Sequence, residues 1–233
     1  AKADLIRRIN VEEAEECEGC PYIERREKGG DAVDYISLEN FSYCNMRCTY
    51  CSPKYYGGTE ASYNAAKVIE ELTNKCGGLN QDCHVVWGGG EPTLSPRFKP
   101  VNEHLISTNA VTKVRVLSNS LKHSDQLHSL IADKRVHLVT SIDAGTPLVF
   151  REIRGKGDIT RVIENLQAYS TTMKEKRRLT IKYILMPNNA SSSELESFVL
   201  LMVEAGLMKS MFQISCDFTL ESAPSLLVCA MYE

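Results

Sequence analysis

Three cysteines stand within eight residues, in the segment CNMRCTYC, as Cys44, Cys48 and Cys51. Cysteine thiolates are the standard protein ligands of iron in iron–sulfur clusters. A [4Fe–4S] cube held by only three cysteines leaves one of its irons free, and that iron can bind a small molecule through nitrogen and oxygen atoms. The spacing therefore predicts an iron–sulfur site with an open coordination position.

Two other interpretations of these cysteines stay open. The pair CEGC, Cys17 and Cys20, could complete a four-cysteine zinc site in an interaction module. A non-catalytic electron-transfer protein is the second alternative, although low-potential ferredoxins usually supply a fourth cysteine locally. Cys76 and Cys83 could join a second metal site only if the fold brings them near another pair. The five histidines show no metal-ligand spacing, and Cys229 lies in an apolar run that favours a buried structural thiol.

The elements that must position the three cysteines alternate between strand and helix along the chain. Strand patterns are expected at 34–41, 84–93, 111–119, 136–143, 178–189 and 211–218. Helical spacing is expected at 62–75, with Ser62 as N-cap, through Phe98, Val101 and Leu105, and at 124–134, 158–173 and 191–206. Strands separated by helices predict a parallel sheet of right-handed βαβ units, and six units are too few for an eightfold barrel. The fold class is therefore α/β, a partial (β/α)6 TIM-like barrel with a short cysteine-containing N-terminal extension.

The expected organisation has three parts. Residues 1–33 form a charge-rich extension that carries the CEGC pair, residues 34–218 form the partial barrel, and residues 219–233 form a tail. Because the chain starts at Ala1 rather than Met, a piece of a longer protein with a truncated tail is one interpretation.

Composition indicates an ordinary globular protein, with 43% hydrophobic and 24% charged residues and a formal net charge of -3. No basic field indicates a nucleic-acid or anionic-lipid partner. The sequence shows no signal peptide and no apolar run of 18 residues, so a cytoplasmic protein without a membrane partner is expected.

Polar and glycine-rich segments follow the predicted strands, where functional groups of parallel sheets gather. The second strand ends in Gly88, Gly89 and Gly90, followed by Glu91, and glycines let backbone approach a ligand closely. A plain strand-to-helix turn is the alternative. The later strands end at Asn119, at Ser141 and Asp143, and at Asn188, for which turns and helix caps are alternatives.

The motif Cys44-x3-Cys48-x2-Cys51, with Tyr50 before the last cysteine, resembles the signature of the radical S-adenosylmethionine (radical SAM) superfamily. GGGEPT resembles that family's GGEP motif, which cradles the methionine amino group. The segments LSN, SID and IRG resemble further segments common in the peptide- and protein-modifying branch. The resemblance covers about residues 34 to 218.

The resemblance implies that the three cysteines hold a [4Fe–4S] cluster whose fourth iron is chelated by S-adenosylmethionine. Reductive cleavage would give a 5′-deoxyadenosyl radical that abstracts hydrogen from an unidentified peptide, protein, sugar or cofactor precursor. An electron donor such as flavodoxin or ferredoxin is the implied partner. The residues expected to bind S-adenosylmethionine are Tyr50, Gly88, Gly89, Gly90, Glu91, Asn119, Ser141, Asp143, Arg154 and Asn188.

Individual roles follow from the same resemblance. Arg154 is expected to pair bidentately with the methionine carboxylate, with an exposed helix-surface arginine as the alternative. Ser141 and Asp143 are expected near the ribose or the methionine, and Asn188 near the adenosine ribose. The backbone of Tyr50 is expected at the adenine edge, unless its ring simply packs.

Overall fold

The structure is a computed structural model. It describes residues 4, 7–9, 11, 32–39, 41–52, 58, 63–75 and 78–216. The chain divides into two compact units, Ala1–Asp31 and Ala32–Glu233. In the first unit, Arg8 and Asp4 form a surface ion pair with Nε 3.2 Å from the carboxylate. The predicted pair Cys17 and Cys20, Cys76 and the tail with Cys229 lie outside the described residues.

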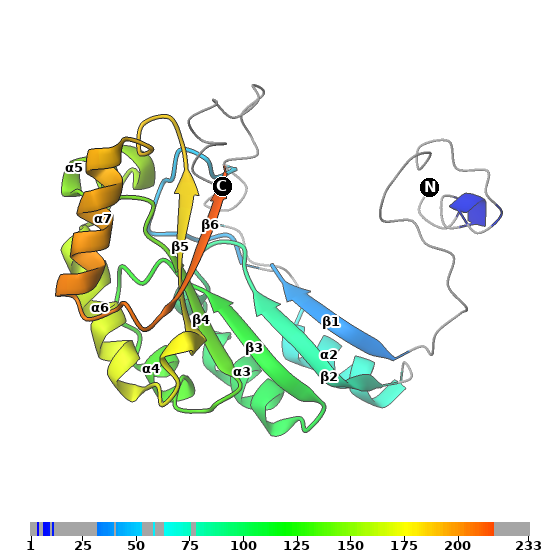
Figure 1. The fold of residues 1–233 in the computed structure, drawn as a ribbon. Coiled ribbons are helices and arrows are strands. Elements are labelled where there is room, and N and C mark those ends of the chain that lie inside the picture. The colour runs from blue at the N-terminus through cyan, green and yellow to red at the C-terminus, as the bar shows by residue number, and fades with distance from the viewer. Residues whose placement is uncertain are drawn as a thin grey trace. The chain divides into compact units, whose positions relative to one another are not determined.

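The second unit contains a parallel sheet of six strands in the order β1-β2-β3-β4-β5-β6 (Figure 1). The strands are β1 Val33–Leu38, β2 Leu79–Trp87, β3 Val111–Leu117, β4 Val136–Ser141, β5 Leu179–Leu185 and β6 Met211–Cys216. Each strand pairs with its sequence neighbours, and β1 does not pair with β6. The predicted partial (β/α)6 barrel is confirmed, and its sheet is not closed.

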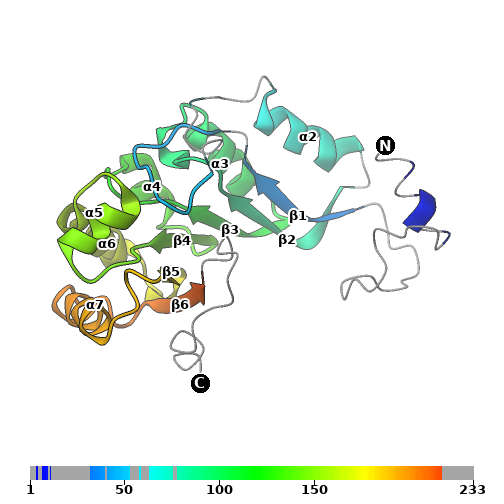
Figure 2. The ribbon, with the colours of Figure 1, turned by 90° about the horizontal axis from the view of Figure 1, so that it is seen from above.

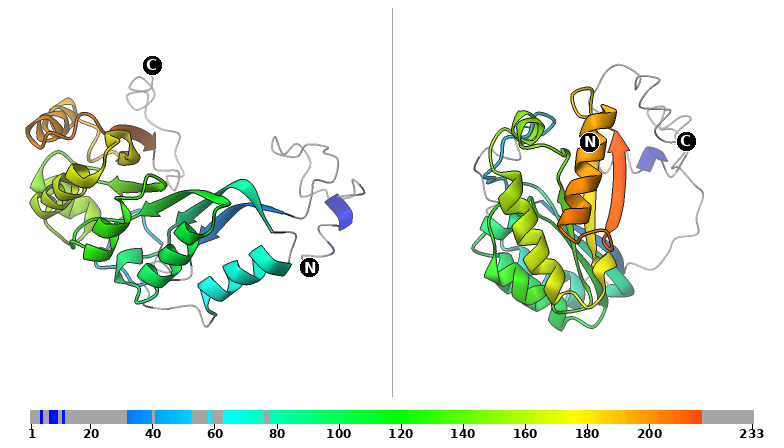
Figure 3. Two further views of the ribbon diagram at one scale, coloured as in Figure 1. Left: turned by 90° about the horizontal axis from the view of Figure 1, so that it is seen from below. Right: turned by 60° about the vertical axis from the view of Figure 1, so that its left-hand side comes forward.

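The helices of this unit lie along the outer face of the curved sheet (Figures 2 and 3). They are α2 Ala65–Lys75, η3 Pro92–Leu94, α3 Phe98–Ser107, α4 Asp125–Leu130, α5 Pro147–Arg154, α6 Ile159–Thr172, η4 Lys176–Arg178 and α7 Ser192–Glu204. Among the described helices of this unit, none covers the other face of the sheet (Figure 2). None of the helices in the described part of the chain is long and apolar enough to cross a bilayer.

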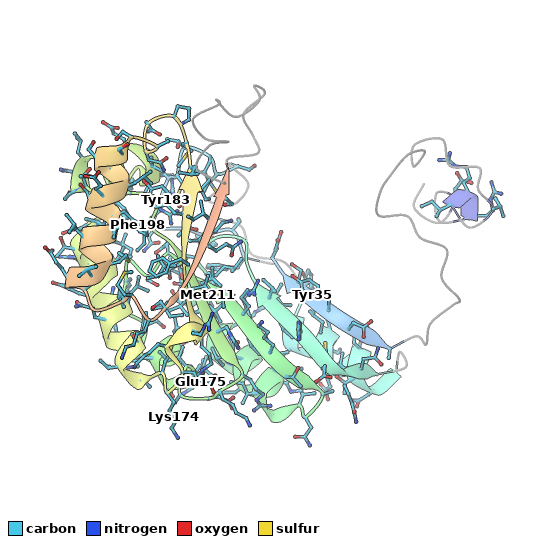
Figure 4. The ribbon with its side chains drawn as sticks, in the orientation of Figure 1. Tyr35, Lys174, Glu175, Tyr183, Phe198 and Met211 are labelled. Carbon is cyan, nitrogen blue, oxygen red and sulfur yellow. The ribbon has the colours of Figure 1, made fainter. Side chains whose placement is uncertain are left out.

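Side-chain alternation along the strands separates a core face from an open face, since successive strand residues point to opposite sides. Val85, Trp87 and Val116 point to the helix side and are fully buried. On the same side the rings of Tyr183 and Phe198 join β5 to α7, with centroids 4.8 Å apart (Figure 4). The alternate residues form the opposite face, which we call the open face. The strand residues that line a cavity there are Tyr35, Val86, Arg115, Leu117, Val139, Ser141, Lys182, Ile184 and Gln213.

Helix termini follow local capping rules, with one correction. Ser124, the first residue of the helix expected at 124–134, accepts a hydrogen bond from the N–H of Leu127 at the start of α4. For α2, the Asn64 side chain accepts from the N–H of Ala66 at 3.1 Å, while Ser62 lies outside the described residues. The residue that caps α2 is therefore Asn64, two residues later than the predicted Ser62. Asparagine is as favourable at an N-cap as serine.

Helix α5 lies between the fourth strand and residue 158, where no helical spacing is expected from the sequence. Thr146 caps it by accepting from the N–H of Val149, and Pro147 occupies its first turn, where a missing N–H costs nothing. Gly155 ends it with φ 68°, donating its N–H to the carbonyl of Arg151. The capping threonine, the proline and the terminal glycine are all visible in the sequence. A helix of only eight residues, however, shows too little apolar periodicity to be predicted from it.

Candidate active site

The three cysteines of CNMRCTYC meet in one cavity of about 490 Å³, at the carboxyl ends of the strands and along the open face. Cys83, in contrast, is fully buried in the core between sheet and helices. Besides the strand residues of the open face, the lining consists of Cys44, Met46, Cys48, Tyr50, Cys51, Gly89, Gly90, Glu91, Ser118, Asn119 and Arg154. The fold thus brings most of the sequence-predicted site residues to one place.

The glycine segment after β2 holds the loop that carries the cysteines. The N–H groups of Gly90 and Glu91 donate to the carbonyls of Phe41 and Tyr43, at 2.8 and 2.7 Å. A Cβ on Gly89, whose φ is +88°, would lie 2.7 Å from the Phe41 carbonyl oxygen, and one on Gly90 would collide with that of Tyr43. Glycine is therefore required at these positions because the backbone of the cysteine loop lies directly against them. Gly89 and Gly90 also line the cavity.

The IRG segment holds the same loop from the other side. The N–H of Thr49 donates to the carbonyl of Ile153 at 2.8 Å, and that of Arg47 donates to the carbonyl of Arg154 at 3.1 Å. A Cβ on Gly155 would collide with the carbonyl oxygen of Arg47. The cysteine loop is therefore held by backbone hydrogen bonds on both sides, from the end of β2 and from the end of α5.

Two donors approach the sulfur of Cys44. The backbone N–H of Met46 lies 3.4 Å from Sγ, and the Asn119 amide nitrogen lies 3.6 Å from it. The same Asn119 amide donates to the side chain of Asn45 at 2.7 Å. Burial raises the pKa of the Cys44, Cys48 and Cys51 thiols. Cationic iron favours deprotonated sulfur, and hydrogen-bond donors at a ligating sulfur stabilise that charge, so this donor set fits an iron–sulfur cluster.

Glu91 joins the ends of β2 and β3. Its Oε1 accepts from the Thr93 hydroxyl at 2.6 Å and the Ser118 hydroxyl at 2.9 Å, and its Oε2 accepts from the N–H of Asn119 at 2.7 Å. Burial raises the pKa of Glu91, and these hydrogen bonds oppose that rise. Both carboxylate oxygens are thus satisfied within the protein, so the geometry gives Glu91 a positioning role for Asn119.

Arg154, Asp143 and Tyr50 form a buried cluster beneath the cysteine loop. Arg154 Nη1 lies 3.0 Å from Asp143 Oδ2, and the Tyr50 hydroxyl donates to the same oxygen at 2.7 Å. Arg154 Nη1 also donates to the Tyr50 hydroxyl. The other oxygen of Asp143 accepts from the N–H of Ile184 at 2.8 Å. Burial raises the pKa of Asp143, and the charge of Arg154 opposes the rise.

This cluster changes the role expected for Asp143 and excludes the alternative given for Arg154. Asp143 is fully buried and does not line the cavity, because both of its oxygens are turned to Ile184, Tyr50 and Arg154. Arg154 is 5% exposed, so it is not a helix-surface arginine. It does line the cavity, and its Nε finds no hydrogen-bond partner among the described residues.

After β5, the asparagine that points inward and makes hydrogen bonds is Asn189 rather than Asn188. Asn188 is exposed and does not line the cavity. Asn189 is fully buried, and its amide donates to the carbonyls of Asp143 and Ile184 at 2.9 and 2.8 Å. Its Oδ1 accepts from the N–H of Met186 at 2.7 Å. Two adjacent asparagines in a turn cannot be told apart by composition, so the sequence does not show which one faces inward.

Sequence reasoning missed several lining residues that sit inside strands. Ser141 lines the cavity as expected, but Arg115, Lys182 and Gln213 line it too. The available signal is strand alternation. A charged residue between two buried valines, as in Val114-Arg115-Val116, points away from the core, toward whatever the open face contains.

The described residues contain no group of three His, Cys, Asp or Glu side chains close enough to hold a single metal ion. Cys44, Cys48 and Cys51 are free thiols that face one cavity. In a [4Fe–4S] cube each cysteine binds a different iron, so its ligands lie farther apart than those of one zinc ion. The arrangement does not favour mononuclear zinc at these three positions.

The chain belongs to the radical SAM superfamily, whose family profile matches residues 41–199. Enzymes of this class use a [4Fe–4S] cluster and S-adenosylmethionine, so these are the cofactors of this chain. The matched range includes the two backbone segments that hold the cysteine loop, and it includes Tyr50, Asp143 and Arg154.

Among curated relatives, the GTP 3′,8-cyclase of Aeromonas hydrophila is 26% identical over 139 residues, covering 58% of this chain and 41% of the relative. That of Limosilactobacillus fermentum is 25% identical over 160 residues, covering 67% and 47%. This chain therefore spans about half the length of the relatives it matches.

Two kinds of solved structure share the fold. Streptococcus suis SuiB bound to S-adenosylmethionine aligns with a TM-score of 0.64 at 14% identity, covering 99% of this chain and 57% of that one. The enzyme anSMEcpe with bound AdoMet and the Cp18Cys peptide aligns with a TM-score of 0.62 at 17% identity, covering 79% and 51%. At these identities the likeness concerns the fold alone.

Proposed function

We propose that this protein reductively cleaves S-adenosylmethionine at a [4Fe–4S] cluster held by Cys44, Cys48 and Cys51. The cofactors together supply a 5′-deoxyadenosyl radical, which abstracts hydrogen from an unreactive carbon of the substrate. The protein's own contribution is to hold, orient and shield the reacting groups. The observation that carries the proposal is that these three thiols share one cavity with Gly89, Gly90 and other cavity-lining residues.

The chain's residues divide the work of the site. The glycine segment and the end of α5 fix the cysteine loop, and the Asn119 amide and the Met46 N–H face the Cys44 sulfur. Arg154 and Ser141 line the cavity, and the Nε of Arg154 is without a partner among the described residues. We assign these two side chains to the polar groups of S-adenosylmethionine, with Arg154 at its carboxylate.

The substrate follows less directly. The curated relatives are named for a reaction of GTP, while SuiB and anSMEcpe are described with peptides. A peptide or protein, a sugar and a cofactor precursor are all compatible with the class of reaction. We further propose an electron donor such as flavodoxin or ferredoxin, in the cytoplasm.

Site-differentiated iron is the test of this function. Anaerobic reconstitution with iron and sulfide should give a [4Fe–4S] cluster, and S-adenosylmethionine should then change the electron paramagnetic resonance signal of the reduced cluster. A cluster that ignores S-adenosylmethionine would support the electron-transfer alternative. Zinc bound in preference to iron would support the interaction module.

A further inference from the structure

Cationic side chains gather on the open face, below the cysteines. Arg115 and Lys182 line the cavity itself. Lys113 stands two residues before Arg115 on β3, so strand alternation places it on the same face. None of the three forms an ion pair within the part of the chain that the structure describes.

The strand register extends this group to two histidines. His84 of β2 pairs with Lys113, and Arg115 pairs with His137 of β4. Side chains at paired positions of neighbouring strands lie side by side, at the strand spacing of about 4.8 Å. Four nitrogen-bearing side chains are therefore contiguous across β2, β3 and β4, and Lys182 adds a charge on β5 beside Ser141.

The titration of His137 is consistent with a positive potential at this place. Its pKa is lowered to about 4, first by burial and then by Lys113, Arg178, Arg115 and His84. The charged neighbours with the largest effect on this imidazole are thus three cations and a second histidine.

Acidic side chains are few on the strands that carry these cations. β3, β4 and β5 contain no aspartate or glutamate, and β2 contains the exposed Asp82, two residues before His84. Glu39, at the carboxyl end of β1, lies against Gly88 at the rim. Asp143 is fully buried and committed to Arg154 and Tyr50.

The cluster and S-adenosylmethionine do not account for all of these cations. A cluster with three thiolate ligands and the methionine carboxylate would lie at the strand ends, beside Arg154. His84, Lys113 and His137 do not line the cavity that contains the thiols, so the positive charge extends along the strands away from them. The charges of Lys113, Arg115 and Lys182 are not offset by an ion pair among the described residues, which points to an anionic ligand that offsets them.

We propose that the open face of the sheet binds the phosphate groups of a small-molecule substrate at Lys113, Arg115 and Lys182. The inference rests on the proposed function and names its substrate class. Several phosphate oxygens can meet cations from two strands at once, and arginine binds phosphate bidentately. A neutral sugar would leave these cations unpaired, and a peptide would need a run of acidic residues.

Binding of inorganic pyrophosphate to the reconstituted protein tests the proposal by anaerobic calorimetry, with S-adenosylmethionine present. Wild-type protein should bind pyrophosphate, and Arg115→Gln and Lys182→Gln should each weaken the affinity about tenfold or more. Arg161→Gln is the matched control, because Arg161 is an exposed arginine of α6 on the outer side. It should change the affinity by less than about twofold.

Several results would overturn the proposal. One is an equal loss in Arg161→Gln, which would mean that only the overall charge of the protein matters. Another is displacement of S-adenosylmethionine by pyrophosphate, which would assign the cations to the cofactor. Tighter binding of hexaglutamate or succinate than of pyrophosphate would assign the site to carboxylates. The proposed function fails separately, if wild-type protein binds pyrophosphate but forms no 5′-deoxyadenosine.

Discussion

The side chain of Arg154 lies 3.0 Å from the carboxylate of Asp143, while its backbone carbonyl accepts a hydrogen bond from the N–H of Arg47 at 3.1 Å. One residue thus ties α5 both to the end of β4 and to the loop that carries the cysteines. The site is therefore coupled to the fold by a buried ion pair.

Arg154→Leu should destabilise the protein by about 3 to 5 kcal/mol, because it leaves the Asp143 carboxylate and the Tyr50 hydroxyl buried without their cation. Arg151→Leu on the same helix is the control, since Arg151 is exposed and should cost less than about 0.5 kcal/mol. Urea unfolding under anaerobic conditions measures both. Equal effects of the two variants would show that the buried pair contributes nothing of its own.

Gly155→Ala should lower the iron content after reconstitution as well as the stability. Its φ of 68° costs an alanine about 1 to 2 kcal/mol, and the new Cβ would also push on the Arg47 carbonyl of the cysteine loop. Gly206→Ala is a matched control, with φ +67° and nothing within 4 Å of its Cβ. It should lose a similar amount of stability from strain alone and keep its full iron content. Full iron in both variants would contradict the role given to Gly155.

Much of this architecture could be predicted from the sequence, and the limits have physical causes. The six strands and the cysteine cavity follow from local patterns and from the rule that parallel strands end at one edge. The inward turn of Asn189 instead of Asn188, and the burial of Asp143, depend on contacts with residues distant in the chain. Strand alternation shows that Arg115 points away from the core, but it does not show that a cavity lies on that face.

Asn189→Ala should cost about 2 to 4 kcal/mol, because it leaves the buried Asp143 and Ile184 carbonyls and the Met186 N–H without their partner. Asn188→Ala, at the exposed neighbour, should leave both stability and S-adenosylmethionine affinity unchanged. Denaturant unfolding and equilibrium binding distinguish the two. A clear loss of S-adenosylmethionine affinity in Asn188→Ala would restore the ribose contact expected from the sequence.

Stability should rise with pH between about 5 and 7 because of His137. Burial and the neighbouring cations lower its folded pKa to about 4, whereas the unfolded value is about 6.5. Within this window the unfolded chain binds more protons, so the free energy of unfolding increases as pH rises, by about 1 to 2 kcal/mol. His137→Gln should remove that gain, as measured by urea unfolding at several pH values. If His137→Gln showed the same pH dependence of stability as wild-type protein, the role given to His137 would be wrong.

The central claim is that Cys44, Cys48 and Cys51 support cleavage of S-adenosylmethionine. The most direct measurement is 5′-deoxyadenosine formed by reconstituted protein with dithionite and S-adenosylmethionine. Wild-type protein should form 5′-deoxyadenosine. The variant Cys83→Ala should form it too, because the Cys83 thiol is buried and lies outside the cavity. Cys48→Ala should lose cluster and product together. No 5′-deoxyadenosine from wild-type protein carrying a full cluster, or undiminished product from Cys48→Ala, would contradict the account.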